Sequence, residues 1–144
     1  MSAKLGDIKN NYERLKQELK LVKYTKLQEL EKIIPGSNES QFDILMQGIP
    51  LAFLPLVHHC FLVYSQNVAD FIKDKGFDLY AKSDYRFMES AYKLLVDSFG
   101  YKPAISIDQF FKDGFAEHKI ILCKDIATLM RQKHAELSRK APTK

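Results

Sequence analysis

The chain has 144 residues, of which 46% are hydrophobic, 12% aromatic and 28% charged, which indicates one globular domain and excludes an intrinsically disordered segment. Two cysteines provide no disulfide framework, and 6 glycines with 5 prolines are too few for a fold built from many tight turns. The formal net charge of +4 permits an acidic partner, and we expect neither a signal peptide nor a membrane span, because no apolar stretch reaches about 20 residues.

The first predicted helix covers residues 7–22. Apolar residues recur there at spacings of three and four, which places them on one face of a helix. They are Leu5, Ile8, Tyr12, Leu15, Leu19 and Val22. A further apolar pattern begins at Leu27 and is expected to continue as helix until Pro35-Gly36 ends it.

The middle of the chain is predicted to contain three more helices. Residues 33–72 contain no lysine or arginine, which suggests that this segment is buried, because an unpaired lysine in a core is unfavourable. Ser40 is expected to cap a short helix that ends near Gly48. A buried helix over residues 51–64 follows, and a shorter one covers residues 67–75.

The C-terminal half is predicted to contain three helices. Asp84 is expected to cap the first, which ends at Gly100, and Ser106 begins a capping box for a small helix that ends at Gly114. The last helix covers residues 116–137, and residues 138–144 form a flexible tail or the start of a linker. Because alternation of period two is nowhere sustained, the predicted fold is all-α, a compact single-domain bundle of about six to seven helices over residues 1–137.

The sequence contains no pattern that indicates catalysis or a bound metal. His58, His59 and Cys60 are adjacent, so on a helix their side chains point about 100° apart and cannot share one ion. Cys123 and His134 lie about 16 Å apart along one helix, too far for a nucleophile and its base. Because glycine-rich phosphate loops and paired carboxylates are also missing, we expect no catalytic residue, no metal and no cofactor.

A row of lysines on the first helix is the strongest functional signal. It runs beside the apolar face, is interrupted by Glu13, and consists of Lys9, Lys16, Lys20 and Lys23. Lys124 and Arg131, seven residues apart on the last helix, are candidates to widen it. Such a row is either a solvated face or the electrostatic footprint for an acidic polymer, such as nucleic acid or the acidic surface of tubulin.

Other interpretations of these helices have weaker support. Aromatic side chains do not alternate with the lysines, as they do in proteins that bind single-stranded nucleic acid, and no helix is rich in arginine, asparagine and glutamine. The heptad-like spacing lasts under three heptads, so packing within a bundle explains it better than a coiled coil. We expect no nucleic acid partner and no membrane partner, and the oligomeric state stays open.

The second half of the chain carries a dense set of residues that resembles one known family. The set comprises Asp84-Tyr-Arg-Phe87, Ala91-Tyr-Lys-Leu-Leu95, Asp97, Phe99, Tyr101-Lys-Pro103, Phe110, Gly114-Phe-Ala-Glu117, Lys119-Ile120, Asp125-Ile126, Met130, His134 and Glu136-Leu137. It resembles the N-terminal domain of the centriolar family of the centrosomal protein of 44 kDa. The rest of the chain agrees more loosely, through Gly6-Asp7, Tyr24, the region from Pro50 to Tyr64 and Ala81-Lys82.

The resemblance implies a calponin-homology-like helical domain that binds microtubules, in a protein of the cytoplasm, the cytoskeleton and the centrosome or centriole. The implied partners are tubulin and other centriolar proteins, and the implied role is to link centriole microtubules to inner scaffold proteins during centriole-to-centrosome conversion. Lys93 and Lys102 lie in the resembling stretch and join the candidate basic face. The alternative is a module that binds another centriolar protein without touching microtubules.

Overall fold

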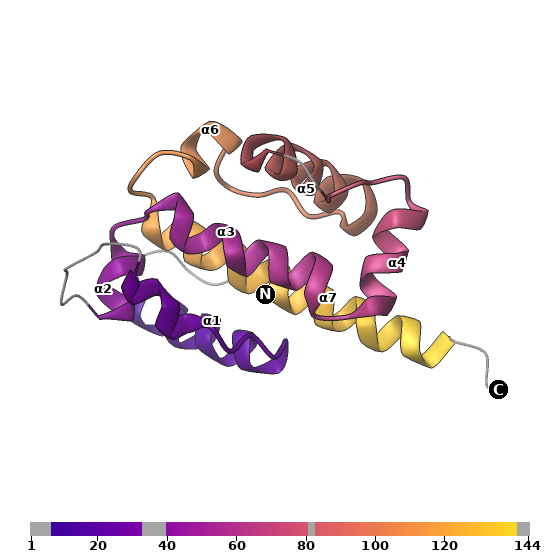
Figure 1. The fold of residues 1–144 in the computed structure, drawn as a ribbon, viewed down its shortest axis with the longest axis horizontal. Helices are drawn as coiled ribbons and strands as arrows, with labels where there is room; N and C mark the ends of the chain where they lie inside the picture. Colours follow the sequence, from indigo (N-terminus) through magenta and orange to yellow (C-terminus); the bar gives the residue numbers. More distant parts are fainter. Residues whose placement is uncertain (1–6, 33–39, 81–82, 141–144) are drawn as a thin grey trace.

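The computed structural model describes residues 7–32, 40–80 and 83–140. Within these ranges the chain forms seven α-helices, one 3-10 helix, one π-helix and no strand, which confirms the predicted all-α bundle. In chain order the elements are α1 (Ile8–Leu21), η1 (Leu27–Lys32), α2 (Gln41–Met46), α3 (Pro50–His58), η2 (His59–Val63), α4 (Gln66–Asp74), α5 (Asp84–Phe99), α6 (Ile107–Phe110) and α7 (Ala116–Lys140) (Figure 1).

The helices are arranged in layers around α3 and α7. These two helices run through the middle of the molecule, α1 packs against α7 on one side, and α5 and α6 lie on the other side (Figure 1). Helix α4 packs against η2 and the C-terminal part of the bundle. A side chain on the outer surface of α1 is therefore separated from one on α5 by the whole thickness of the middle layer.

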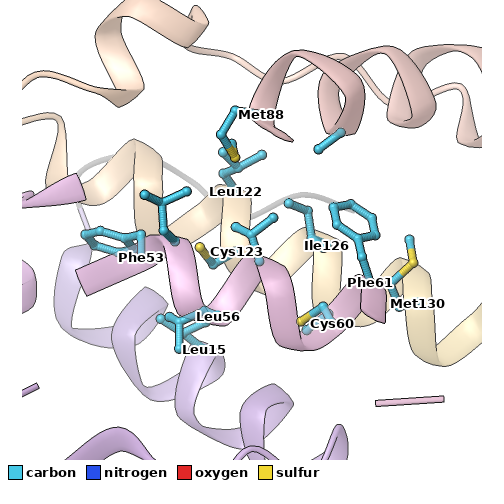
Figure 2. Packing of buried hydrophobic residues seen from close by; sticks show 14 of the residues in the cluster. Leu15, Phe53, Leu56, Cys60, Phe61, Met88, Leu122, Cys123, Ile126 and Met130 are labelled. Carbon is cyan, nitrogen blue, oxygen red and sulfur yellow. The ribbon is translucent and has the colours of Figure 1, made fainter. Parts of the chain in front are cut away.

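The core lies where α1, α3, α5 and α7 meet. The apolar face predicted for α1 is confirmed from Tyr12 to Val22, where its residues at spacings of three and four are buried. Ile8 is half-buried, and Leu5 lies outside the described residues. Figure 2 shows core side chains of α3 and η2 meeting those of α7, with Met88 of α5 on one side and Leu15 of α1 on the other. Each large apolar side chain buried in this way contributes about 1.5–3 kcal/mol, so these contacts fix the position of α1.

Capping side chains set the starts of several helices. Ser40 and Ser106 each accept a hydrogen bond from the backbone N–H three residues later, at 3.1 Å. This confirms the cap expected at Ser40 and the capping box predicted at Ser106, and Ser40 also forms a capping box. The predicted cap at Asp84 is wrong: Ser83 is the cap and Asp84 is the first helical residue, because the hydroxyl one position earlier reaches the free N–H groups.

Three predicted boundaries differ from the structure or lie outside the described residues. The segment after Leu27 is a 3-10 helix that ends at Lys32, and the predicted stop at Pro35-Gly36 lies outside the described residues. Helix α6 ends before Gly114. Helix α7 continues through residues 138–140, beyond the predicted end of the last helix, and residues 141–144 lie outside the described part.

The apolar segment predicted as one buried helix differs from that prediction in shape and in burial. Helix α3 passes into η2, a wider π-helical turn in which the N–H of Tyr64 bonds the carbonyl of His59 at 2.8 Å. Pro55 is exposed, and Leu51 and Val63 are 60% and 68% exposed, so the prediction of burial is wrong along this edge. The segment is apolar on every face, whereas the fold leaves open the face that carries Leu51, Pro55 and Val63.

Candidate functional site

Helix α1 carries its lysines on one flank, beside the buried face. Successive residues of an α-helix are turned by about 100°, so Lys16 points about 100° away from the buried Leu15, and Lys20 points about 100° away from the buried Leu19. We call this row the basic stripe. It consists of Lys9, Lys16, Lys20 and Lys23.

The basic stripe is largely free of carboxylates. Lys9, Lys20 and Lys23 are exposed, and none of them forms an ion pair with any residue that the structure describes. Lys16 lies 3.7 Å from Glu13, but the two side chains are 37% and 61% exposed, and an exposed pair of this kind contributes only about 0–1 kcal/mol. The four ammonium groups therefore remain available to an acidic partner.

Lys23 occupies a backbone position that favours glycine. Its φ is +62°, in the left-handed region, its N–H bonds the carbonyl of Lys20 at 3.0 Å, and the N–H of Tyr24 bonds the carbonyl of Leu19 at 2.8 Å. These two bonds form a Schellman motif, in which the left-handed residue is usually glycine. A lysine here is less favourable than glycine by about 1 kcal/mol.

Arg131 of α7 does not join the basic stripe. Its Nε and Nη2 donate to the two carboxylate oxygens of Glu18 at 2.8 and 2.9 Å, a bidentate pair. Glu18 is two residues from both Lys16 and Lys20, which places it about 160° round α1, on the opposite flank. Arg131 therefore clamps α1 to α7 and is neutralised there.

Lys124 is also neutralised. Its ammonium lies 2.7 Å from the carboxylate of Asp125, and both side chains are only 12% exposed. Asp125 accepts a further hydrogen bond from the hydroxyl of Tyr101 at 2.8 Å, and burial together with this carboxylate raises the pKa of Tyr101. Lys124 thus belongs to a polar network that joins α7 to the connection after α5.

Lys93 and Lys102 are exposed, but on a different part of the molecule. Lys93 lies on α5 and Lys102 in the connection between α5 and α6, across the middle layer from α1 (Figure 1). The structure therefore does not bring the eight predicted basic residues to one face. It brings together only Lys9, Lys16 and Lys20 on α1, with Lys23 in the turn that follows the helix.

Comparison with known proteins identifies the family to which this domain is related. Residues 7–144 match the family model described as "Centrosomal spindle body, CEP44". The chain belongs to the CEP44 family. The centrosomal proteins of 44 kDa from Homo sapiens and Macaca fascicularis are each 38% identical to it over 133 residues, and the one from Xenopus tropicalis is 34% identical over 133 residues.

These alignments cover 92% of this chain but 31% of each relative, so the chain spans about a third of the length of the curated relatives it matches. Membership of the CEP44 family confirms the resemblance seen in the sequence. It also confirms the predicted location at the centrosome, within the cytoskeleton.

The CEP44-family domain contains one further cation that the sequence analysis missed. The side chain of Lys119 is completely buried, and its ammonium donates to the carbonyl of Gly48 at 2.5 Å and to that of Lys112. Burial lowers its pKa to about 8. Lys119 lies four residues before the buried Cys123, so the helical spacing of the last helix could have placed it on the core face.

The two cysteines are not placed for reaction, and no metal-binding cluster is found in the described part of the chain. Both thiols are free and buried, and burial raises the pKa of Cys60 to about 12, which disfavours the reactive thiolate. Among the described residues no group of three or more histidine, cysteine, aspartate or glutamate side chains is placed to hold a metal ion. No helix in residues 7–32, 40–80 and 83–140 combines the length and apolarity of a membrane span.

Proposed function

We propose that this CEP44-family domain binds microtubules without catalysing a reaction, and that the basic stripe of α1 makes the contact. The observation that carries the proposal is the free state of the stripe: Lys9, Lys20 and Lys23 are exposed and form no ion pair with the described residues, and the half-buried Lys16 has only a weak pair with Glu13. Lys124 and Arg131 of α7, by contrast, are neutralised by Asp125 and Glu18. From Lys9 to Lys20 the stripe extends about 16 Å along a rigid helix. Such an array suits an acidic filament surface.

The backbone at Lys23 supports this proposal. A glycine would fit the left-handed position at the end of α1 better, so the lysine lowers local stability. A backbone position of this kind is a known feature of binding sites, where a side chain is kept for its contact with a ligand. The ammonium of Lys23 extends the stripe beyond the last turn of α1.

The family gives this contact its cellular setting. In the longer protein the domain links centriole microtubules to inner scaffold proteins during centriole-to-centrosome conversion, with tubulin and other centriolar proteins as partners. A calponin-homology-like arrangement of the helices is part of the same proposal. Its supports are the family membership and the all-α fold.

Co-sedimentation with microtubules tests the contact. Charge reversal at Lys16 and Lys20 (Lys16→Glu with Lys20→Glu) is expected to abolish pelleting and to leave the helical circular dichroism unchanged, because both side chains are at the surface. Wild-type pelleting should weaken as salt rises, since about 0.1 M salt screens exposed charges beyond about 10 Å.

The matched control reverses Lys93 and Lys102, which are both exposed but lie across the middle layer. This variant should pellet like wild type. If both variants lose pelleting equally, binding responds to net charge alone, and the assignment of the microtubule contact to α1 is wrong. Pelleting that ignores both salt and the Lys16 and Lys20 reversal would favour the alternative, a module for another centriolar protein.

A further inference from the structure

A groove on the α3 side of the domain exposes apolar side chains. It has a volume of about 580 Å³ and runs between the segment after α1 with η1 on one wall and α3 with η2 on the other. Val63 and Leu51 both line it, and at 68% and 60% they are the two most exposed large apolar side chains among the described residues. Scattered exposed apolar residues are ordinary, but a groove that gathers the most exposed ones marks an interaction site.

The exposed apolar residues form a row along the helix. Pro55 follows Leu51 by four positions, and Val63 follows Leu51 by twelve. All three line the same groove, and at 1.5 Å per residue the row spans about 18 Å. Pro55 has no N–H, so the carbonyl of Leu51 on this face lacks its usual helical donor. The row thus offers apolar contact together with a backbone acceptor.

The opposite wall is already fixed in place. The Nε2–H of His59 donates to the carbonyl of Val22 at 2.6 Å, and the ring of Tyr24 packs edge-on against the His59 imidazole with centroids 5.1 Å apart. These contacts join the end of α1 to η2 across the base of the groove. The groove is therefore preformed, which lowers the entropy lost when a partner binds.

The charges at the edge of the groove indicate the net charge that a partner needs. Lys23 and Lys26 are exposed at the edge of the groove, and Glu29 is the one acidic residue among the described residues that line it. The wall formed by α3 and η2 lies in the stretch of the chain that contains no lysine or arginine. A ligand that covers the apolar row therefore meets cations along one border only.

We propose that this groove binds an amphipathic helical segment of a partner protein, whose apolar residues cover Leu51, Pro55 and Val63 and whose carboxylates face Lys23 and Lys26. A helix laid along α3 has the length and shape to fill a groove of this kind. A second copy of this chain fits worse, because a symmetric dimer through the groove would bring together two surfaces that each carry Lys23 and Lys26 against Glu29 alone among the described lining residues. The inference does not depend on microtubule binding by the basic stripe.

Selection of peptides from a displayed library of helical sequences tests the proposal on the domain itself. The selected peptides are expected to have apolar residues at spacings of three and four, with aspartate or glutamate along one side of that apolar face. Its affinity for the domain should fall about tenfold or more in the double variant Leu51→Asp with Val63→Asp. The reversal of Lys23 and Lys26 to glutamate should weaken it to a smaller degree.

The matched control is Val96→Asp, which adds a carboxylate at an exposed apolar residue of α5, 48% exposed and outside the groove. This variant should bind the peptides like wild type, and the circular dichroism of all variants should be unchanged. An empty selection, a pool of basic peptides, or binding that survives the Leu51 and Val63 substitutions would overturn the proposal. So would sedimentation showing that the domain dimerises through these residues.

Discussion

The cations of α1 and of α7 have the same chemistry but opposite surroundings. On α1, Lys9 and Lys20 are exposed and have no ion pair with the described residues. On α7, Lys119 is buried against backbone carbonyls and Arg131 is clamped by Glu18. A cation that must lose water to fold requires a protein partner, so α7 uses Lys119 and Arg131 to hold the bundle together. The charges of α1 stay hydrated and remain available for binding.

The largest expected effect comes from breaking the anchor around Lys119. Gly48 has a φ of +67°, and a Cβ atom there would lie 2.0 Å from the carbonyl oxygen of Gly114. Gly48→Ala is expected to lower the free energy of unfolding by about 3 kcal/mol or more, because the two backbones must move apart. Urea denaturation measures this. Gly100→Ala, at φ +61° but with open space around it, should lose only about 1 kcal/mol, and equal losses would contradict the account.

The next effect removes the buried cation itself. Lys119→Met leaves the carbonyls of Gly48 and Lys112 without this donor and is expected to lower the free energy of unfolding by about 1–3 kcal/mol near pH 7. Differential scanning calorimetry at several protein concentrations checks it. A variant as stable as wild type would mean that the bonds from Lys119 to the carbonyls of Gly48 and Lys112 do not stabilise the fold.

The pH dependence of this variant sharpens the same point. Burial lowers the pKa of Lys119 to about 8 from its usual 10.5, so between these two values the unfolded chain binds a proton that the folded chain does not. Stability therefore rises with pH in that window for this group, by about 3 kcal/mol in total. Wild type should gain stability relative to Lys119→Met from pH 8 to pH 10.5. If the free energies of unfolding of the two proteins change in parallel with pH, the charge of Lys119 is not buried as described.

A smaller effect compares one cation from each helix. Arg131→Met leaves the carboxylate of Glu18 without its bidentate partner, so it is expected to lower the free energy of unfolding by about 1–2 kcal/mol. Lys20→Met, at an exposed position of α1, should change it by no more than about 0.5 kcal/mol. Urea denaturation of both variants measures these changes. If Lys20→Met lowers the free energy of unfolding as much as Arg131→Met, the proposed difference between the cations of α1 and α7 is wrong.

The smallest effect has the opposite sign. Lys23→Gly relieves the left-handed backbone at the end of α1 and is expected to raise the free energy of unfolding by about 1 kcal/mol. The same variant should bind microtubules more weakly, because it removes one ammonium from the basic stripe. Thermal denaturation and co-sedimentation on one protein preparation give both values. A variant that is more stable and also pellets fully would remove Lys23 from the proposed contact.

Features set by neighbouring residues could be predicted from the sequence. The buried face of α1 follows from apolar spacing, and the caps at Ser40 and Ser106 follow from hydroxyls placed three residues before a polar side chain. Ser83 was missed because Asp84 beside it is an equally good capping residue by type. Only the backbone geometry decides between two adjacent candidates.

Features set by contacts between distant segments could not be predicted. Arg131 and Glu18 are 113 residues apart in the chain, so no local pattern shows that one neutralises the other. The exposure of Leu51 and Val63 was hidden for a related reason: a segment that is apolar on every face does not reveal which face the fold leaves open. The charge pattern of the sequence located the lysines of α1, but it could not separate them from the paired cations of α7.

Zero-length carbodiimide cross-linking of the domain to microtubules tests the central claim most directly, because it joins lysine amines only to carboxylates that they touch. Mass spectrometry of the cross-linked peptides should find tubulin carboxylates joined to Lys9, Lys16, Lys20 or Lys23 on α1. The exposed Lys93 and Lys102 should stay unlinked. Cross-links concentrated at Lys93 and Lys102, with the stripe unmodified, would contradict the account.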